Sequence, residues 1–258
     1  MIKNRNYYLR KTHRYLGVII GIQFMAWTIG GLYFSWNNID KVHGDHLRKS
    51  VSYLQTDFNS VSPTEAVKNL RATKSVDSIL SINLISVLNK PTYQIKYFSG
   101  HTGEGMHVHA HLALADALNG NIRPPLNKEE AIAIATENVV DKAALFQVDY
   151  LELTDGHHEY REKPLPAWAV TFKNPDCTIY ISAELGTFQS IRHNQWRIFD
   201  FLYMMHTMDY QGRDDFNNVL LKIFSIFGIL TISSGFILFL VSSPTILKLR
   251  RKLKPNQA

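Results

Sequence analysis

The sequence is poor in cysteine: Cys177 is the only one among 258 residues. A single thiol excludes a disulfide within the chain and an iron–sulfur cluster held by this chain alone. Common catalytic signatures are also missing. There is no dinucleotide fingerprint and no His-Glu-x-x-His helix, and the glycine-rich stretch 100–105 lacks the lysine and the following helix that a phosphate-binding loop needs. Nothing in these patterns supports hydrolysis.

Charge is absent from two long segments. Residues 15–39 and 223–247 contain no Asp, Glu, Lys or Arg. Each run would be about 38 Å long as a helix, against a hydrocarbon core of about 30 Å. We therefore expect two transmembrane helices, at 15–39 and 219–243, in contact with the lipid bilayer. The first run is too long for a signal peptide and ends without a small-residue cleavage site, so we expect an uncleaved anchor.

Acidic residues are missing from both ends, since all 22 lie between Asp40 and Asp215. The tails 1–14 and 244–258 carry basic residues instead. Because positively charged flanks stay on the cytoplasmic side, we expect both termini to be cytoplasmic and residues 40–218 to be periplasmic or extracytoplasmic. This places the protein in the cytoplasmic (inner) membrane. The net charge of +6 comes from the tails, so we expect no nucleic-acid partner.

The segment between the two runs repeats a pattern of helix, strand, strand, tight turn and strand remnant. Each copy has an N-cap residue three positions before a glutamate, an alternating strand, and a strand that runs into a glycine turn. These features fall at 62–67 and 127–132, at 91–97 and 166–172, and at 116–120 and 182–186. The repeat predicts two α+β modules with antiparallel sheets at 55–125 and 126–193, after a linker at 40–54.

These modules, with an Asp-Ala-x-x-Gly turn at 116–120, resemble the PepSY domain. Arg10-Lys11-Thr12-His13-Arg14-Tyr15-Leu16-Gly17 and Trp196-Arg197-Ile198-Phe199-Asp200-Phe201-Leu202, with the following His206 and Asp209, resemble PepSY-associated transmembrane proteins. The resemblance covers nearly the whole chain. Four-span relatives include reductases that handle iron–siderophore complexes and carry haem on membrane histidines. With two spans, this chain resembles half of such a protein.

The resemblance implies a membrane-anchored, haem-binding electron-transfer component in the extracytoplasmic reduction of ferric iron or an iron–siderophore complex. Its cofactor would be haem b, with His13 and His206 as axial ligands and Arg197 neutralising a propionate. A homodimer or a membrane redox partner would complete it. The alternative is a non-enzymatic PepSY binding module that inhibits, chaperones or senses an exported peptidase or another partner.

Helical periodicity places His13 among small residues. His13 shares one narrow stripe with the small residues Gly17, Gly21, Thr28, Gly31 and Ser35. A second stripe, in the other span, comprises Gly228, Thr231, Gly235 and Ser242. Small residues allow membrane helices to approach closely, so the two stripes should face each other or a second copy. The plainer alternative for His13 is an interfacial histidine bonded near the lipid headgroups.

His206 lies in a region, 194–218, that we interpret as an interfacial amphipathic helix and loop before the second span. Arg197, Asp200 and Thr207 fall on its polar side, and His206 falls among aromatic residues. The alternative for His206 is a core residue bonded to a backbone carbonyl. His13 belongs to the inner side of the membrane and His206 to the outer side. One chain should therefore not place both on one iron, but two copies could form one bis-histidine site near each face.

The densest histidine cluster is His107, His109 and His111. On a strand these alternate residues project from one face, where imidazoles bind zinc, copper or iron. The alternative is a strand edge whose imidazoles face water. We treat the three as a candidate metal site.

Overall fold

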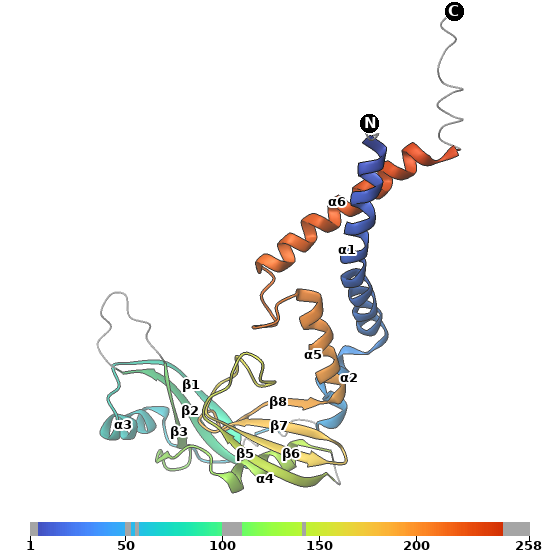
Figure 1. Cartoon of the computed structure of the whole chain (residues 1–258). Coiled ribbons are helices and arrows are strands. Elements are labelled where there is room, and N and C mark those ends of the chain that lie inside the picture. The colour runs from blue at the N-terminus through green and yellow to red at the C-terminus, as the bar shows by residue number, and fades with distance from the viewer. Residues whose placement is uncertain (1–4, 50–52, 55–56, 100–109, 141–142, 245–258) are drawn as a thin grey trace, which may run out of the picture. The chain divides into compact units, whose positions relative to one another are not determined.

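A computed structural model describes residues 5–49, 53–54, 57–99, 110–140 and 143–244. The chain divides into two compact units (Figure 1). The helical unit comprises residues 1–37 and 198–258. The α+β unit comprises residues 38–197. The predicted class, a mixed α+β domain with two antiparallel sheets and two candidate membrane helices, is confirmed at this level.

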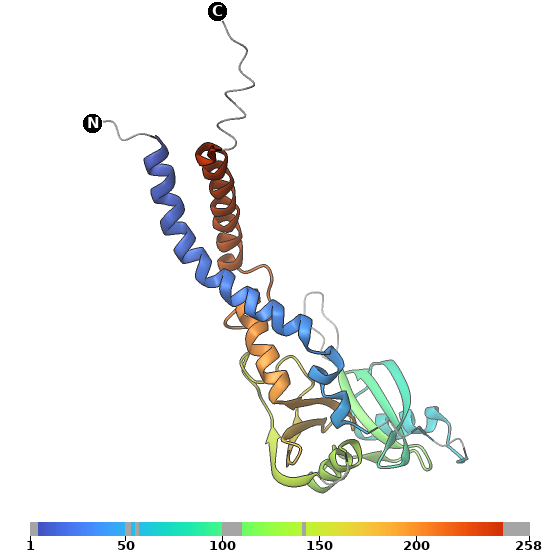
Figure 2. The ribbon, with the colours of Figure 1, turned by 90° about the vertical axis from the view of Figure 1, so that its right-hand side faces the viewer.

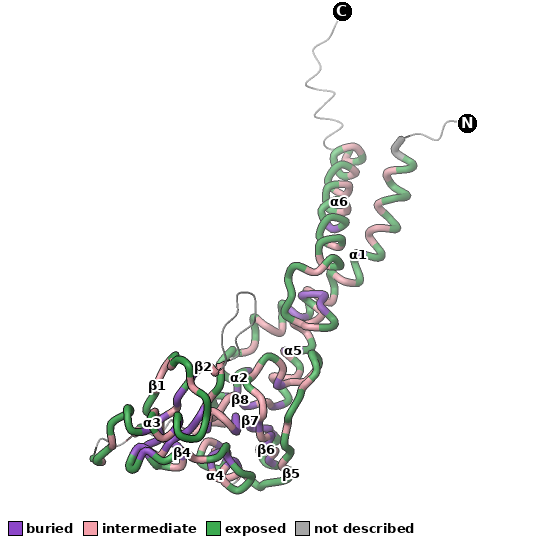
Figure 3. The backbone as a smooth tube through the Cα atoms, turned by 90° about the vertical axis from the view of Figure 1, so that its left-hand side faces the viewer, coloured by how far each residue is buried: buried purple, intermediate pink, exposed green. Residues whose placement is uncertain are grey.

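The helical unit contains two helices that are long and apolar enough to cross a membrane: α1 (Arg5–Trp36) and α6 (Val219–Ser242). Both are largely exposed in the structure, as the green colour in Figure 3 shows, which suits helices that meet lipid. Helix α1 ends at Trp36, not at the predicted Ile39, because Asn38 accepts a hydrogen bond from Asp40 N and caps a new helix.

Between them lies α5 (Asn194–Thr207), whose second half packs beside α1 (Figure 2). Its residues Asp200 and Thr207, on the polar side of the predicted amphipathic helix, are buried. Asp200 forms an ion pair with Arg213, and Thr207 Oγ1 donates to Arg213 O at 3.0 Å. The polar side of α5 therefore holds the loop 208–218, which the helical wheel could not reveal.

The α+β unit begins with two short helices, α2 (Ile39–His43) and η1 (Asp45–Leu47). Helix α3 (Pro63–Thr73) then precedes a sheet of order β1-β2-β3-β4, and α4 (Lys128–Asn138) precedes one of order β5-β6-β7-β8. The strands of the first sheet are β1 (Ser78–Val87), β2 (Lys90–Phe98), β3 (His111–Asp116) and β4 (Ile122–Arg123). The strands of the second are β5 (Ala144–Leu151), β6 (Ala167–Lys173), β7 (Cys177–Ser182) and β8 (Phe188–His193).

Both sheets are antiparallel throughout. The structure adds β1 and β5 before the strands that the repeat predicted. These two strands lie at sheet edges and are mostly exposed or half-buried. Residues 146–150 of β5 do alternate between apolar and polar side chains, but the repeat was drawn from the strands that follow β1 and β5. The capping residues predicted at the start of α4 are confirmed. Asn127 and Glu130 form a reciprocal capping box, with Glu130 N donating to Asn127 Oδ1 at 2.9 Å.

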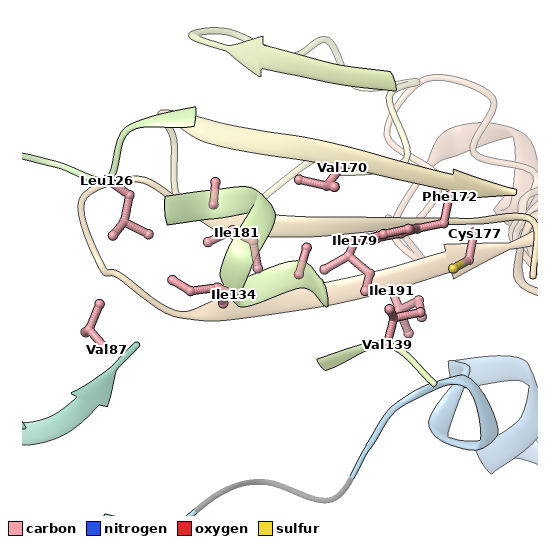
Figure 4. Close-up of a cluster of buried hydrophobic side chains, with 12 residues drawn as sticks. Val87, Leu126, Ile134, Val139, Val170, Phe172, Cys177, Ile179, Ile181 and Ile191 are labelled. Carbon is pink, nitrogen blue, oxygen red and sulfur yellow. The ribbon is translucent and has the colours of Figure 1, made fainter. Parts of the chain in front are cut away.

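The larger core lies between α4 and the inner face of the second sheet (Figure 4). Val87, from the end of β1, belongs to the same cluster, so the two sheets share apolar contacts. Gly186 sits at this junction with a φ of +69°, and a Cβ there would lie 3.0 Å from Leu114 Cδ1. Only glycine suits both the left-handed backbone and the close approach. Gln94 Nε2 also donates to Leu185 O at 2.9 Å across the junction.

Candidate functional site

His13 lies in α1 against the small-residue stripe of α6. Its Nδ1 is 2.7 Å from Ser234 Oγ, and a Cβ on Gly235 would lie 3.2 Å from its Cε1. The hydroxyl of Ser234 donates its single proton to Thr231 O at 2.8 Å. In this arrangement the hydroxyl accepts from His13, and Nδ1 would carry the proton of a neutral ring. Nε2 is then the basic nitrogen, the atom that a metal ligand uses.

An apolar hollow of about 450 Å³ opens beside this contact on α6. It is lined by Gly235, Ile232, Phe236 and Phe239. Gly235 therefore has two roles: it lets the His13 ring approach, and it lines the hollow. This shallow apolar hollow next to the imidazole of His13 is compatible with a large planar cofactor and equally with a lipid tail.

The two predicted small-residue stripes behave differently. The α6 stripe faces α1, since Gly228 lies against Phe24 and Gly235 against His13. On α1, a Cβ added to Gly17, Gly21 or Gly31 would meet no described atom within 4 Å. His13 therefore contacts α6, whereas the rest of its stripe is open in the single chain.

His206 lies on α5 beside the middle of α1. Its ring centroid is 5.5 Å from that of Trp27 and 6.3 Å from that of Phe34. Two side chains of α1 fix this part of α5, because Gln23 Nε2 and Trp27 Nε1 reach Met205 O at 2.8 and 3.3 Å. The imidazole is exposed and packs on aromatic rings. The contacts with Met205 could not be predicted from the sequence, because they join positions that lie far apart along the chain.

The two histidines of one chain do not meet. His13 and Trp27 are fourteen positions apart on α1, which corresponds to about 21 Å along a helix. His206 lies at the Trp27 end of this interval. Both axial ligands of a haem bind the same iron atom, so one chain cannot supply this pair to one iron.

Arg197 is engaged in the α+β unit. Its Nε and Nη2 donate to Glu159 Oε2 and Oε1 at 2.7 and 3.1 Å. Tyr180 OH donates to Glu159 Oε1 at 2.8 Å. Burial raises the pKa of Glu159, but the bonds from Arg197 and Tyr180 outweigh burial and hold that pKa below its ordinary value. Arg197 would have to release Glu159 to bind a propionate.

Of the predicted metal strand, only His111 can be placed. It is exposed at the start of β3, with its ring centroid 5.5 Å from that of Tyr97. His107 and His109 lie outside the described residues. Within the described ranges, no group of three or more His, Cys, Asp or Glu side chains is arranged to hold a metal ion. The convergence of the three histidines stays a prediction.

The α+β unit contains a cationic cavity that the sequence analysis missed. We use this name for the hollow of about 330 Å³ whose lining includes Arg48, Lys163, Arg192, Asp45 and Ser190. Its cations come from three segments that lie far apart in the sequence. No local pattern could therefore have found it.

Comparisons of the chain with models of protein families, with curated proteins and with solved structures find no match. What the fold defines is therefore a class: a mixed α+β protein with two helices that could span a membrane.

Proposed function

We propose that this chain is a membrane-anchored haem-binding component that passes electrons to ferric iron or an iron–siderophore complex outside the membrane. The observation that carries the proposal is the environment of His13. Its Nδ1 is hydrogen-bonded to Ser234 in a helix pair that is apolar enough for a membrane, which leaves Nε2 as the nitrogen that could bind a metal. Metal-ligating histidines commonly have the second ring nitrogen fixed in this way.

Two copies would supply the second ligand. The distance between His13 and His206 along α1 excludes a shared iron within one chain, so each iron would use one histidine from each copy. Two further features favour association. The small-residue face of α1 at Gly17, Gly21 and Gly31 is open, and such faces let membrane helices pack closely. Four helices from two copies would also make a bundle, an architecture that holds cofactors between facing helices.

The orientation belongs to the same proposal. Basic residues flank both apolar helices on the terminal side, which favours cytoplasmic termini and an extracytoplasmic α+β unit. Haem b, when bound, would supply a one-electron couple, and the side chains of this protein would hold and orient it. The reductant would come from a membrane partner, because the sequence has no nicotinamide or flavin fingerprint.

An absorption spectrum of the full chain, produced with added haem and purified in detergent, tests this function. We expect a Soret band and a dithionite difference spectrum that are lost in His13→Ala and in His206→Ala. His157→Ala, which removes an exposed loop histidine, is the matched control and should keep the spectrum. Ser234→Ala should weaken haem binding by about 10-fold or more, as outer-shell substitutions do. A haem-replete preparation without a Soret band would refute the proposal.

The second candidate is a non-enzymatic binding module that senses, chaperones or inhibits an exported peptidase or another partner. The cationic cavity favours it, since a preformed cavity in the α+β unit can bind a ligand without any redox cofactor. A colourless preparation that co-purifies with a peptidase would select this function. In that case His13→Ala and His206→Ala should leave the partner bound.

A further inference from the structure

The cationic cavity lies at the free edge of the second sheet. Strand β8 is the last strand in the order β5-β6-β7-β8, and its residues 188–192 all line the hollow. Arg48 and Asp45 reach the cavity from the segment after α2, and Lys163 reaches it from the loop between β5 and β6. The cavity is therefore made by three segments that the fold of one unit brings together.

Positive charge dominates this lining. Arg48, Lys163 and Arg192 face a single carboxylate, that of Asp45. The nearby Glu159 does not form an ion pair with any of the three, because its carboxylate oxygens accept from Arg197 and Tyr180. Arg192 reaches only backbone oxygen there, since its Nε donates to Glu159 O at 3.1 Å.

Burial disfavours the charged forms of Lys163 and Arg192. Burial, and then the proximity of Arg192, lowers the pKa of Lys163. Burial lowers the pKa of Arg192 to about 10, despite the favourable field of Glu159. Both effects have the same physical cause: the cations are partly removed from water and lack a contacting counter-ion. An anion placed in the cavity would raise both pKa values, because it would stabilise the charged forms of Lys163 and Arg192.

Two buried polar atoms in the lining also lack partners among the described residues. Ser190 is 7% exposed, and its Oγ makes no hydrogen bond. Arg48 Nε is buried without a partner, while the guanidinium stacks on Phe188 with Cζ 4.1 Å from the ring centroid. An unmade hydrogen bond at a buried group is costly, so such groups are rare and call for an explanation. A hydroxyl and a guanidinium that share one hollow are the donors that an oxyanion accepts from.

We propose that the cationic cavity binds the anionic head of a ligand, a phosphate or carboxylate group, between Arg48, Lys163 and Arg192, with Ser190 Oγ as a further donor. The oxyanion belongs either to a soluble ligand or to a lipid headgroup, since both present the same chemistry. The site lies within the α+β unit. It does not depend on the membrane histidines, so it stands or fails separately from haem binding.

Binding of inorganic phosphate to the full chain in detergent micelles, measured by isothermal titration at constant ionic strength, tests the site. Citrate is the carboxylate probe. We expect saturable binding of at least one of them, and a higher midpoint of thermal unfolding in its presence. Lys163→Gln and Ser190→Ala each remove one donor with little change in volume. Each should weaken binding by about 10-fold or more, which is the usual effect of losing a hydrogen bond to a charged group.

Lys128→Gln is the matched control, because it removes the same charge from an exposed position on α4. It should leave the dissociation constant within about twofold of the wild-type value. Equal weakening by Lys128→Gln and Lys163→Gln would mean that the net charge of the protein attracts the anion, and this would overturn the site.

Nanodiscs separate the two sources of the oxyanion. If a lipid headgroup occupies the cavity, discs containing phosphatidylglycerol should raise the thermal midpoint of the wild type but not of Lys163→Gln, and should suppress phosphate binding. If the ligand is soluble, phosphate should bind equally in discs of phosphatidylcholine with or without phosphatidylglycerol. Failure of phosphate, citrate and phosphatidylglycerol to act through Lys163 and Ser190 would overturn the proposal.

Discussion

Replacing Glu159 by glutamine isolates the charge at the centre of the α+β unit. Glutamine keeps the shape of the side chain, and its carbonyl oxygen can still accept from Tyr180 OH, which lies 2.8 Å from Glu159 Oε1. What disappears is the counter-charge for Arg197, which donates twice to this carboxylate. Arg192 also loses the favourable field that partly offsets its burial. Glu159→Gln should therefore destabilise the unit by leaving cations without their acid.

The magnitude follows from the exposure of the pair. Removing one partner of a buried ion pair costs about 3–5 kcal/mol. The side chains of Arg197 and Glu159 are 38% and 20% exposed, so solvent screens part of this interaction. We expect a loss of about 2 kcal/mol. For a unit of this size, that loss lowers the midpoint of thermal unfolding by about 4–8 °C.

Scanning calorimetry of the full chain in detergent measures this shift. Glu65→Gln is the matched control, since Glu65 pairs with Lys68 in an exposed i, i+3 pair on α3 and its loss should cost less than about 0.5 kcal/mol. The double variant Glu159→Gln/Arg197→Gln should recover part of the stability, because it removes the unpaired cation as well. A shift no larger than that of Glu65→Gln, or a double variant less stable than Glu159→Gln, would refute the reasoning.

Two further predictions concern the segment that packs against β8. Burial lowers the pKa of His193, and its hydrogen bond to Val42 O at 3.1 Å only partly opposes this. As the pH falls below about 6.5, the imidazole of His193 is protonated in the unfolded chain before it is protonated in the folded protein, so the folded state loses stability in that range. His193→Gln should reduce this loss, measured as the change in the midpoint of thermal unfolding between about pH 8 and pH 5. Gly44 has a φ of +85°, and a Cβ there would lie 2.6 Å from Ile191 Cγ2. Gly44→Ala should cost about 2 kcal/mol or more through backbone strain and overpacking, and an unchanged thermal midpoint would show that the segment shifts freely.

Several elements could be predicted because their signals are local. The two candidate membrane helices follow from long uncharged runs. The absence of charge over about twenty consecutive residues can be read directly from the sequence, without knowledge of the tertiary structure. Helix α4 follows from Asn127 and Glu130, which cap its first turn three positions apart. Strands β2 and β6 follow from alternation, because both are central strands with one face on a core. The edge strands β1 and β5 were not predicted, although residues 146–150 of β5 also alternate.

Helical periodicity alone did not show what covers the polar side of α5. It identified a polar side that includes Asp200 and Thr207. In the fold the loop 208–218 covers it, with Arg213 paired to Asp200. A wheel reports which residues share a face, but what covers that face depends on residues elsewhere in the chain.

The chemistry of the candidate sites rests on contacts across long stretches of sequence. The sequence singled out His13, but the hydrogen-bond partner of its Nδ1 is Ser234, 221 positions away. Arg197 was predicted to neutralise a haem propionate, and in the fold Glu159, 38 positions earlier, binds it. The cationic cavity has no signature in the sequence at all. Local patterns report burial and helical or strand period, whereas the pairing of charges is decided only when packing brings distant segments together.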